Sequence, residues 1–287
     1  MSTTFTTLIS ADELRAALAR SASIVLVDAS FDLADPSAGE SSWRAGHPPG
    51  AVYLHLERDL SGAKSARAGE FRGRHPLPSR ADFAATLGRI GITPATQVVA
   101  LDRQGGMYAA RLWWMLRWMG HESVAVLDGG VAAWTASGGA FATDVPTPRA
   151  AAPYPERAAL VDTIDANALA AALGRVRLLD ARAGERFRGE VEPLDQAAGH
   201  IPGATNRFFK DNLRADGRFK PAVQLRADFT ALLGPQTASN TVHQCGSGVT
   251  ACHNLLAMEH AGLTGSKLYP GSWSEWSADP SRPVARS

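Results

Sequence analysis

The chain contains one sequence pattern twice, and this internal repeat limits its possible folds more than any other feature. The segment Ala45-Gly-His-Pro-Pro-Gly-Ala returns 153 positions later as Ala198-Gly-His-Ile-Pro-Gly-Ala. An apolar run that ends at Asp28 likewise returns in a run that ends at Asp180. Landmarks that recur in the same order indicate a duplicated domain.

The spacing between the two copies predicts where the domains begin and end. A third landmark ends at Trp134 and returns at Trp276, an offset of 142 instead of 153. The first copy therefore has eleven extra residues, which we assign to the Gly- and Arg-rich run 61–75. A stretch with four prolines and little periodicity indicates a linker. We expect one domain over 1–142, a linker over 143–155 and a second domain over 156–287, which fits two domains of about 150 residues.

Each copy alternates short apolar runs with amphipathic segments. In the first copy we expect strands at 24–28, 97–101 and 123–127, and helices at 11–20, 80–89 and 107–119. In the second copy we expect strands at 177–180, 241–243 and 267–269, with helix starts at or near Asp165, Arg226 and Val249. This alternation predicts an α/β fold, a mostly parallel sheet with helices on both faces. Ligands of such sheets bind beyond the carboxyl ends of the strands, here after Leu101 and His243.

Charge and composition exclude several classes of protein. Twenty-nine basic and 28 acidic residues leave a net charge of +1, so we expect neither a nucleic-acid partner nor a membrane-surface role. Two cysteines indicate a reducing compartment, and we expect a cytoplasmic protein. We expect no signal peptide, because the first residues lack a positive flank and an apolar run. The apolar stretch 107–119 is too short to span a bilayer.

The loop after the strand at 241–243 has the pattern of a nucleophile site. Cys245 is followed by Gly246-Ser-Gly248 and then by a helix. Two glycines allow backbone N–H groups to converge on one point, and a helix start adds positive charge there. Both effects favour the thiolate, which is the nucleophile. The first copy has Asp102 near this position and no cysteine. We therefore expect the second domain to be catalytic and the first to be non-catalytic.

Other interpretations of the two cysteines fit less well. A small buried hydrophobe is the plain alternative for Cys245, and it is the better interpretation for Cys252, which lies about one turn into the helix. A disulfide between them is not expected at this separation. Together with His243 and His253 their spacing matches no usual zinc pattern, so we expect no metal and no cofactor.

The segment Cys245-Gly-Ser-Gly-Val-Thr-Ala resembles the active-site loop of the mercaptopyruvate sulfurtransferases of the rhodanese superfamily. Both repeat landmarks and the segment 271–276 fit the same family, over nearly the whole chain. The resemblance implies two tandem rhodanese-like domains. It also implies that Cys245 takes a sulfane sulfur from a small anionic donor as a persulfide and passes it to a thiol, to thioredoxin or to cyanide.

The resemblance also implies which residues bind the donor. The persulfide would lie against the backbone of Gly246, Ser247, Gly248, Val249 and Thr250. Arg186 stands where the family has an arginine that contacts the donor carboxylate, and its plain alternative is a solvated loop charge. The family often has a second arginine after a Glu-Pro pair, but Leu194 occupies that position here. Arg182 or Arg188 would then substitute for it, or donor binding would be weaker.

Two histidines lie in the repeated landmark. We interpret His200 as structural, whereas His47 stays a possible site residue. Some family members place an acid shortly before this histidine, but residues 35–44 do not align with that pattern. A serine–histidine–acid relay is therefore not carried over to this chain.

The leading hypothesis is transfer of sulfur from 3-mercaptopyruvate, and the alternative is transfer from thiosulfate. Thiosulfate is a dianion and favours a more cationic loop, such as the Arg-Lys that thiosulfate-type rhodaneses have at positions 246 and 247. A phosphatase of this fold needs an arginine where Ala251 stands. A non-catalytic sulfur carrier would load one sulfur and stop. The sequence leaves the acceptor, the oligomeric state and the pathway open.

Overall fold

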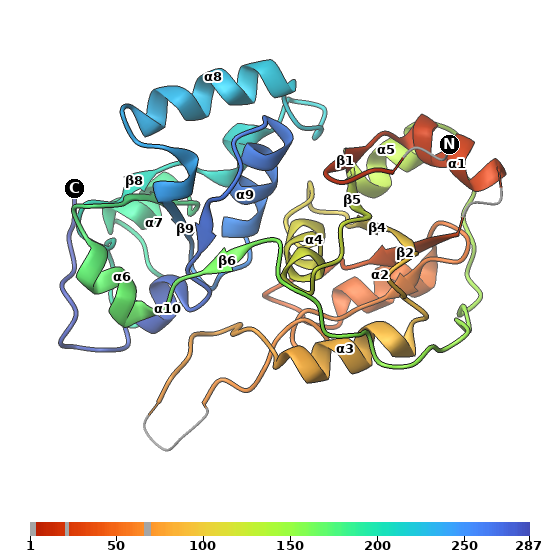
Figure 1. The fold of residues 1–287 in the computed structure, drawn as a ribbon, viewed down its shortest axis with the longest axis horizontal. Coiled ribbons are helices and arrows are strands. Elements are labelled where there is room, and N and C mark those ends of the chain that lie inside the picture. The colour runs from red at the N-terminus through yellow and green to blue at the C-terminus, as the bar shows by residue number, and fades with distance from the viewer. Residues whose placement is uncertain (1–3, 21–22, 66–69) are drawn as a thin grey trace. The chain divides into compact units, whose positions relative to one another are not determined.

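The protein forms two compact units (Figure 1). The computed structural model describes residues 4–20, 23–65 and 70–287. The first unit comprises 1–61, 78–160 and 215–219, and the second comprises 62–77, 161–214 and 220–287. The expected linker thus lies within the first unit. The segment 62–77, which contains most of the run that we assigned as extra residues, belongs to the second unit although it lies in the middle of the first copy in sequence. Residues 66–69 of that run lie outside the described residues.

The first unit contains a parallel five-stranded sheet with the strand order β1-β5-β4-β2-β3. Its strands are β1 Leu8–Ile9, β2 Ile24–Asp28, β3 Val52–Tyr53, β4 Gln97–Leu101 and β5 Val124–Leu127. Its helices are α1 Ala11–Ala19, α2 Ala38–Ala45, α3 Arg80–Arg89, α4 Ala109–Trp118 and α5 Gly130–Ala136. The side chains of Ser10 and Ser79 accept backbone N–H bonds at the starts of α1 and α3, as N-cap residues do.

The second unit repeats this topology with the order β6-β10-β9-β7-β8, again all parallel. Its strands are β6 Asp162–Thr163, β7 Arg177–Asp180, β8 Thr205–Asn206, β9 Thr241–Gln244 and β10 Lys267–Leu268. Its helices are α6 Ala166–Ala172, α7 Gly184–Arg188, α8 Ala222–Leu233, α9 Ala251–His260 and α10 Ser272–Trp276, with 3₁₀ turns at Phe209–Asn212 and Ala238–Asn240. Arg226 lies inside α8, not at its start, because the helix begins directly after Pro221.

Strand residues alternate between two packed faces in both sheets. In β4, Val99 and Leu101 join a core cluster with Leu14 of α1 and Trp134 of α5. Helix α4 also contacts β4 and β5. In the second unit Val242 of β9 packs with residues of α6 and α10, whereas the next residue contacts α9. Neighbouring residues of a strand point to opposite faces of the sheet, so these contacts show that helices pack on both faces. The predicted α/β architecture, two mostly parallel sheets each with helices on both faces, is confirmed.

No helix in the described part of the chain is long and apolar enough to cross a membrane.

His243 of β9 gives the stability of the protein a pH dependence. Its ring is fully buried, its Nε2 lies 3.2 Å from Met258 Sδ, and burial lowers its pKa to about 3. The unfolded chain binds a proton at this residue below pH 6.5, whereas the folded chain stays neutral until about pH 3. Unfolding therefore takes up a proton, and this residue lowers the free energy of unfolding by about 1.4 kcal/mol per pH unit below 6.5.

We expect His243→Leu to reduce the loss of stability on acidification. Urea unfolding at pH 7.5 and pH 5 measures it, and the wild type should lose about 2 kcal/mol more than the variant. Equal losses in both proteins would show that His243 does not titrate on unfolding.

Candidate active site

The strand register places Cys245 and Asp102 at the same position of their two sheets. The pairing of β2 with β4 aligns Asp28 with the last residue of β4, and the pairing of β7 with β9 aligns Asp180 with the last residue of β9. The next residue along the chain is Asp102 in the first unit and Cys245 in the second. The two loops therefore leave equivalent strand ends.

Asp102 supplies its own loop with an anion. The side chain is fully buried, and its two oxygens accept backbone N–H bonds at 2.8 to 2.9 Å. The donors are Gln104, Gly106, Tyr108 and Ala109. Burial raises the pKa of Asp102, and these four bonds oppose that rise. The turn at this strand end is thus built to surround a negative group.

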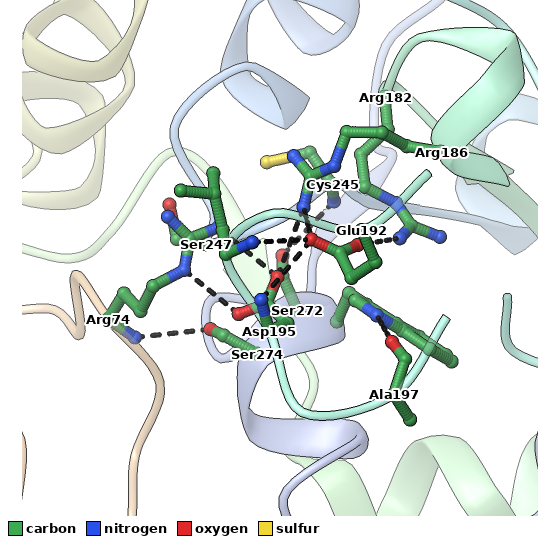
Figure 2. A network of polar contacts seen from close by, with 12 residues as sticks. Arg74, Arg182, Arg186, Glu192, Asp195, Ala197, Cys245, Ser247, Ser272 and Ser274 are labelled. Atoms are coloured by element: carbon green, nitrogen blue, oxygen red, sulfur yellow. Dashed lines mark hydrogen bonds and ion pairs between the residues drawn. The ribbon is translucent and has the colours of Figure 1, made fainter. Parts of the chain in front are cut away.

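In the second unit the start of α10 holds the equivalent loop. Cys245 is 2% exposed, and its N–H donates to Ser272 Oγ at 3.1 Å. The carbonyl of Cys245 accepts from the N–H of Trp273 at 3.0 Å, and that of Gly246 accepts from Ser274 at 2.9 Å. Ser272 has φ +54°, a conformation that residues other than glycine rarely adopt. The third landmark of the repeat therefore fixes the Cys245 loop (Figure 2).

Two backbone N–H groups of this loop match those that bind Asp102. Ser247 and Val249 follow Cys245 by two and four residues, at the spacing of the first two donors to Asp102. Neither N–H has a hydrogen-bond acceptor within the described residues. From this equivalence of spacing we expect the two N–H groups to face a group on Cys245, as their counterparts in the first unit face the Asp102 carboxylate.

The rest of the loop is closely packed. Gly248 has φ +74°, and a Cβ there would lie 2.3 Å from the carbonyl oxygen of Pro270, so only glycine fits. Thr250 is the N-cap residue of α9 but makes no side-chain cap bond. Cys252 is fully buried, and its Sγ lies 3.4 Å from the carbonyl oxygen of Gly248. Both cysteines are free thiols.

Arg186 of α7 is directed toward the loop by two buried carboxylates (Figure 2). Its Nη2 lies 2.6 Å from Glu192 Oε1 and 3.1 Å from Asp195 Oδ2, and both acidic side chains are 3% exposed. Burial raises the pKa of Asp195, against the effect of the arginines beside it. A Cβ added to Gly246 would lie 3.4 Å from Arg186 Nη1, so the guanidinium is next to the residue that follows Cys245.

Arg74 is a second arginine beside the same loop. It lies on the segment 62–77, and its Nε donates to Asp195 Oδ1 at 2.9 Å. Its Nη2 is 3.3 Å from Asp195 Oδ2 and would be 2.7 Å from a Cβ on Gly246. Sequence analysis did not single out Arg74 as a site residue. The signal that could have found it is the Gly- and Arg-rich run in the first copy that has no counterpart in the second.

The next residue, His75, contacts the loop as well. Its Nδ1 lies 2.9 Å from Ser247 Oγ, and both side chains are buried. Sequence analysis considered His47 as the histidine of a possible relay. The structure instead brings His75 to the serine, and both residues belong to the second unit.

The guanidinium of Arg182 is held by contacts within the second unit that stabilise the fold. Its Nη2 lies 2.7 Å from Asp180 Oδ2 and 2.7 Å from the carbonyl oxygen of Gly199, and its guanidinium stacks over Trp273. In the first unit Arg103 makes the equivalent pair of contacts, to Asp28 and to the carbonyl before His47. A guanidinium in this position is therefore common to both copies and is not special to the Cys245 loop.

Arg188 and His47 are engaged elsewhere. Arg188 is about half exposed and pairs with Glu190 at 2.7 Å. The ring of His47 stacks on Trp43 in the first unit, and its Nδ1 lies 2.8 Å from the Trp43 carbonyl oxygen. His200 repeats this arrangement on Phe187. The shared geometry indicates that both histidines stabilise their turns, and a role for His47 in the site stays a prediction.

Among the described residues, no group of three or more His, Cys, Asp or Glu side chains could hold a metal ion.

Comparison with known proteins identifies two matching regions. The family model described as Rhodanese-like domain matches residues 10–137 and 165–279. These two regions correspond to the two copies of the repeat, and the second contains Cys245, Arg186 and Asp195.

Relatives and solved structures match over nearly the whole chain. A protein of Pseudomonas aeruginosa named "Probable 3-mercaptopyruvate sulfurtransferase" is 48% identical over 97% of this chain and 97% of its own. A thiosulfate sulfurtransferase of Gallus gallus is 33% identical over 89% of this chain and 86% of its own. The structure of 3-mercaptopyruvate sulfurtransferase from Leishmania major has a TM-score of 0.83 and 28% identity, covering 95% of this chain and 74% of that one.

Proposed function

Because this chain belongs to the rhodanese family, we propose that it moves sulfur from 3-mercaptopyruvate, through a persulfide on Cys245, to a thiol or to cyanide. The chain is a sulfurtransferase. The observation that carries the proposal is the equivalence of Cys245 with Asp102. After β4, the carboxylate of Asp102 accepts four backbone N–H bonds. After β9, the proposed nucleophile Cys245 is followed by N–H groups at the same spacing.

The first half of the reaction loads the cysteine. The Cys245 thiolate attacks the sulfur of the donor, and an S–S bond forms as the bond between that sulfur and C3 of 3-mercaptopyruvate breaks. The electron pair stays on the organic fragment as the enolate of pyruvate, which takes up a proton. The N–H groups of Ser247 and Val249 bind the outer, negatively charged sulfur of the persulfide, as an oxyanion hole binds oxygen.

We assign the transfer of that proton to Ser247 and His75. The hydroxyl of Ser247 lies on the loop two residues after Cys245, and His75 Nδ1 is 2.9 Å from it. An imidazole at this distance can take a proton from the donor thiol through the hydroxyl and return it to the enolate carbon. This pair replaces the relay that the sequence did not support through His47.

The second half of the reaction unloads the cysteine. A thiolate or cyanide attacks the outer sulfur, the S–S bond breaks, and Cys245 is released as a thiolate. The proposed partners are a small anionic donor and a thiol, thioredoxin or cyanide acceptor, with no cofactor. The two free thiols support a reducing setting, and we place the protein in the cytoplasm.

The charge of the site favours 3-mercaptopyruvate over thiosulfate. Two guanidinium groups, of Arg74 and Arg186, face the loop, and two carboxylates, of Glu192 and Asp195, pair with them. Such a site has little net charge, so it suits a carboxylate recognised by hydrogen-bond geometry better than it suits a dianion. Thiosulfate is the alternative donor, in keeping with the relative from Gallus gallus.

The test is a side-by-side measurement of kcat/KM for the two donors with cyanide as acceptor. We expect a clear preference for 3-mercaptopyruvate and many turnovers per chain. A preference for thiosulfate would mean that the arginines outweigh the neutral loop. A single turnover that stops after loading would instead identify a sulfur carrier.

A further inference from the structure

We infer that the loop 189–196 is the surface on which a small dithiol protein docks to take sulfur from Cys245, and that Val191 and Leu194 supply its apolar contact. The inference rests on the proposed function and deepens it, because it names the surface that receives the acceptor in the second half of the reaction. The loop follows α7 and belongs to the second unit, as Cys245 does.

The loop turns its carboxylates inward and its apolar side chains outward. The side chains of Glu192 and Asp195 are each 3% exposed. Val191 and Leu194 are 50% and 45% exposed, and Pro193 between them is exposed as well. Folding normally buries apolar side chains and leaves carboxylates in water. The paired arginines account for the buried carboxylates, but the stability of the fold gains nothing from an apolar run, formed by residues 191, 193 and 194, that faces the solvent.

Hydrogen bonds hold the loop in this arrangement. The N–H groups of Leu194 and Asp195 donate to Glu192 Oε1 at 3.1 and 3.2 Å. The N–H of Glu190 donates to the carbonyl oxygen of Glu185, on α7, at 3.0 Å. A surface that is already ordered loses little conformational entropy when a partner binds, which suits a docking site.

The same contacts join the apolar run to the active site. Arg186 Nη2 lies 2.6 Å from Glu192 Oε1, the atom that also accepts from the N–H of Leu194 (Figure 2). The Nη1 of this arginine would be 3.4 Å from a Cβ on Gly246, the residue after Cys245. Only two side chains in this series of contacts separate the apolar run from the Cys245 loop. A protein that contacts the run is therefore next to the persulfide.

The charges around the run suit the approach of a thiolate. Cys245 is 2% exposed, so an acceptor has to bring its own sulfur to the loop. The attacking form of a thiol is the anion, which exposed carboxylates would repel. The loop buries two of its carboxylates, and the exposed Glu190 is neutralised by Arg188 at 2.7 Å. The surface thus fits an apolar protein face that surrounds a thiol.

Transfer to such a partner needs no further reactant. The first thiolate of the acceptor attacks the outer sulfur, a new S–S bond forms, and the bond to Cys245 breaks with its electron pair left on Cys245 as a thiolate. The second thiolate of the acceptor then attacks the first sulfur of the acceptor. This step forms the acceptor disulfide and releases the transferred sulfur as hydrosulfide. The dithiol supplies the two electrons that reduce this sulfur.

The experiment compares reduced thioredoxin and cyanide as acceptors, with 3-mercaptopyruvate as donor. The double variant Val191→Thr/Leu194→Asn keeps branched side chains at both positions but makes them polar. We expect it to raise the KM for reduced thioredoxin about tenfold or more, as the loss of central apolar anchors does at interfaces. The value of kcat/KM with cyanide should stay within about twofold of the wild type, because cyanide needs no docking surface.

Val223→Thr is the matched control, because it makes the same change at a residue of α8 that is 78% exposed in the same unit. We expect its KM to equal that of the wild type with both acceptors, and a rise like that of the double variant would contradict the inference. So would a double variant with an unchanged thioredoxin KM, or with equal losses for both acceptors.

The wild type separates this inference from the proposed function. If it passes sulfur to cyanide but not to reduced thioredoxin, the inference is wrong and the proposed function stands. If it does not turn over 3-mercaptopyruvate with cyanide either, the result contradicts the proposed function itself.

Discussion

Cys245→Ser is expected to lower sulfur transfer by at least about a thousandfold and to leave the fold intact. A hydroxyl at this position cannot form a persulfide, and the side chain differs from cysteine by one atom, so the packing against α10 is kept. Mass spectrometry after incubation with 3-mercaptopyruvate alone measures loading directly. The wild type should gain the mass of one sulfur atom and the variant should gain none.

Cys252→Ser is the matched comparison for this variant. Cys252 is the other free thiol of the chain, and its Sγ lies 3.4 Å from the Gly248 carbonyl oxygen. A serine keeps a donor to that carbonyl, so transfer should stay within about threefold of the wild type. Loss of loading in Cys252→Ser with persistence in Cys245→Ser would move the chemistry to Cys252 and contradict the proposed mechanism.

Arg186→Ala is expected to raise the KM for 3-mercaptopyruvate about 10- to 150-fold. A hydrogen bond to a charged group contributes about 1.5–3 kcal/mol, and each 1.4 kcal/mol corresponds to a factor of ten. The variant also leaves Glu192 without its closest arginine, at a buried site. Circular dichroism and thermal unfolding therefore accompany the kinetics. Arg186→Lys retains the charge near Glu192 and should fold like the wild type with a smaller rise in KM.

Arg188→Ala shows whether the effect is local. It lies two residues from Arg186 on the same short helix but pairs with Glu190 in the solvent. We expect its KM within about twofold of the wild type, because an exposed ion pair contributes little. A rise as large as that of Arg186→Ala would show that Arg188 also contacts the donor, against the expected local effect.

The sequence predicts the elements of this protein well because local chemistry determines them. Apolar runs coincide with β2, β4 and β7, and the serines at positions 10 and 79 cap their helices as expected. The strand end that bears Cys245 follows from the same pattern. Arg226 was misplaced by four residues because Pro221, not a polar cap, precedes the first turn of α8.

The remaining site residues could not be predicted, because tertiary contacts bring them together. His75 and Ser247 are 172 positions apart, and Arg74 and Ser274 are 200 apart. A repeat directs attention to positions that the copies share, whereas the segment 62–77 has no counterpart in the second copy. The contact of Asp195 with the site could not be predicted either, because its partner Arg74 lies on this segment, 121 positions earlier in the chain.

The carboxylate of Asp102 makes the two copies differ in where the anion at their equivalent turns comes from. In the first copy the anion that the N–H groups of the turn bind is a side chain of the chain itself, so it is always present. In the second copy, under the proposed function, the anion is the outer sulfur that the donor leaves on Cys245. The turn there is held by its hydrogen bonds to the start of α10, so the proposal makes the bound anion, and not the fold of the turn, the part that changes during a catalytic cycle. The first copy thus carries as a fixed side chain what the second copy would acquire and release with every turnover.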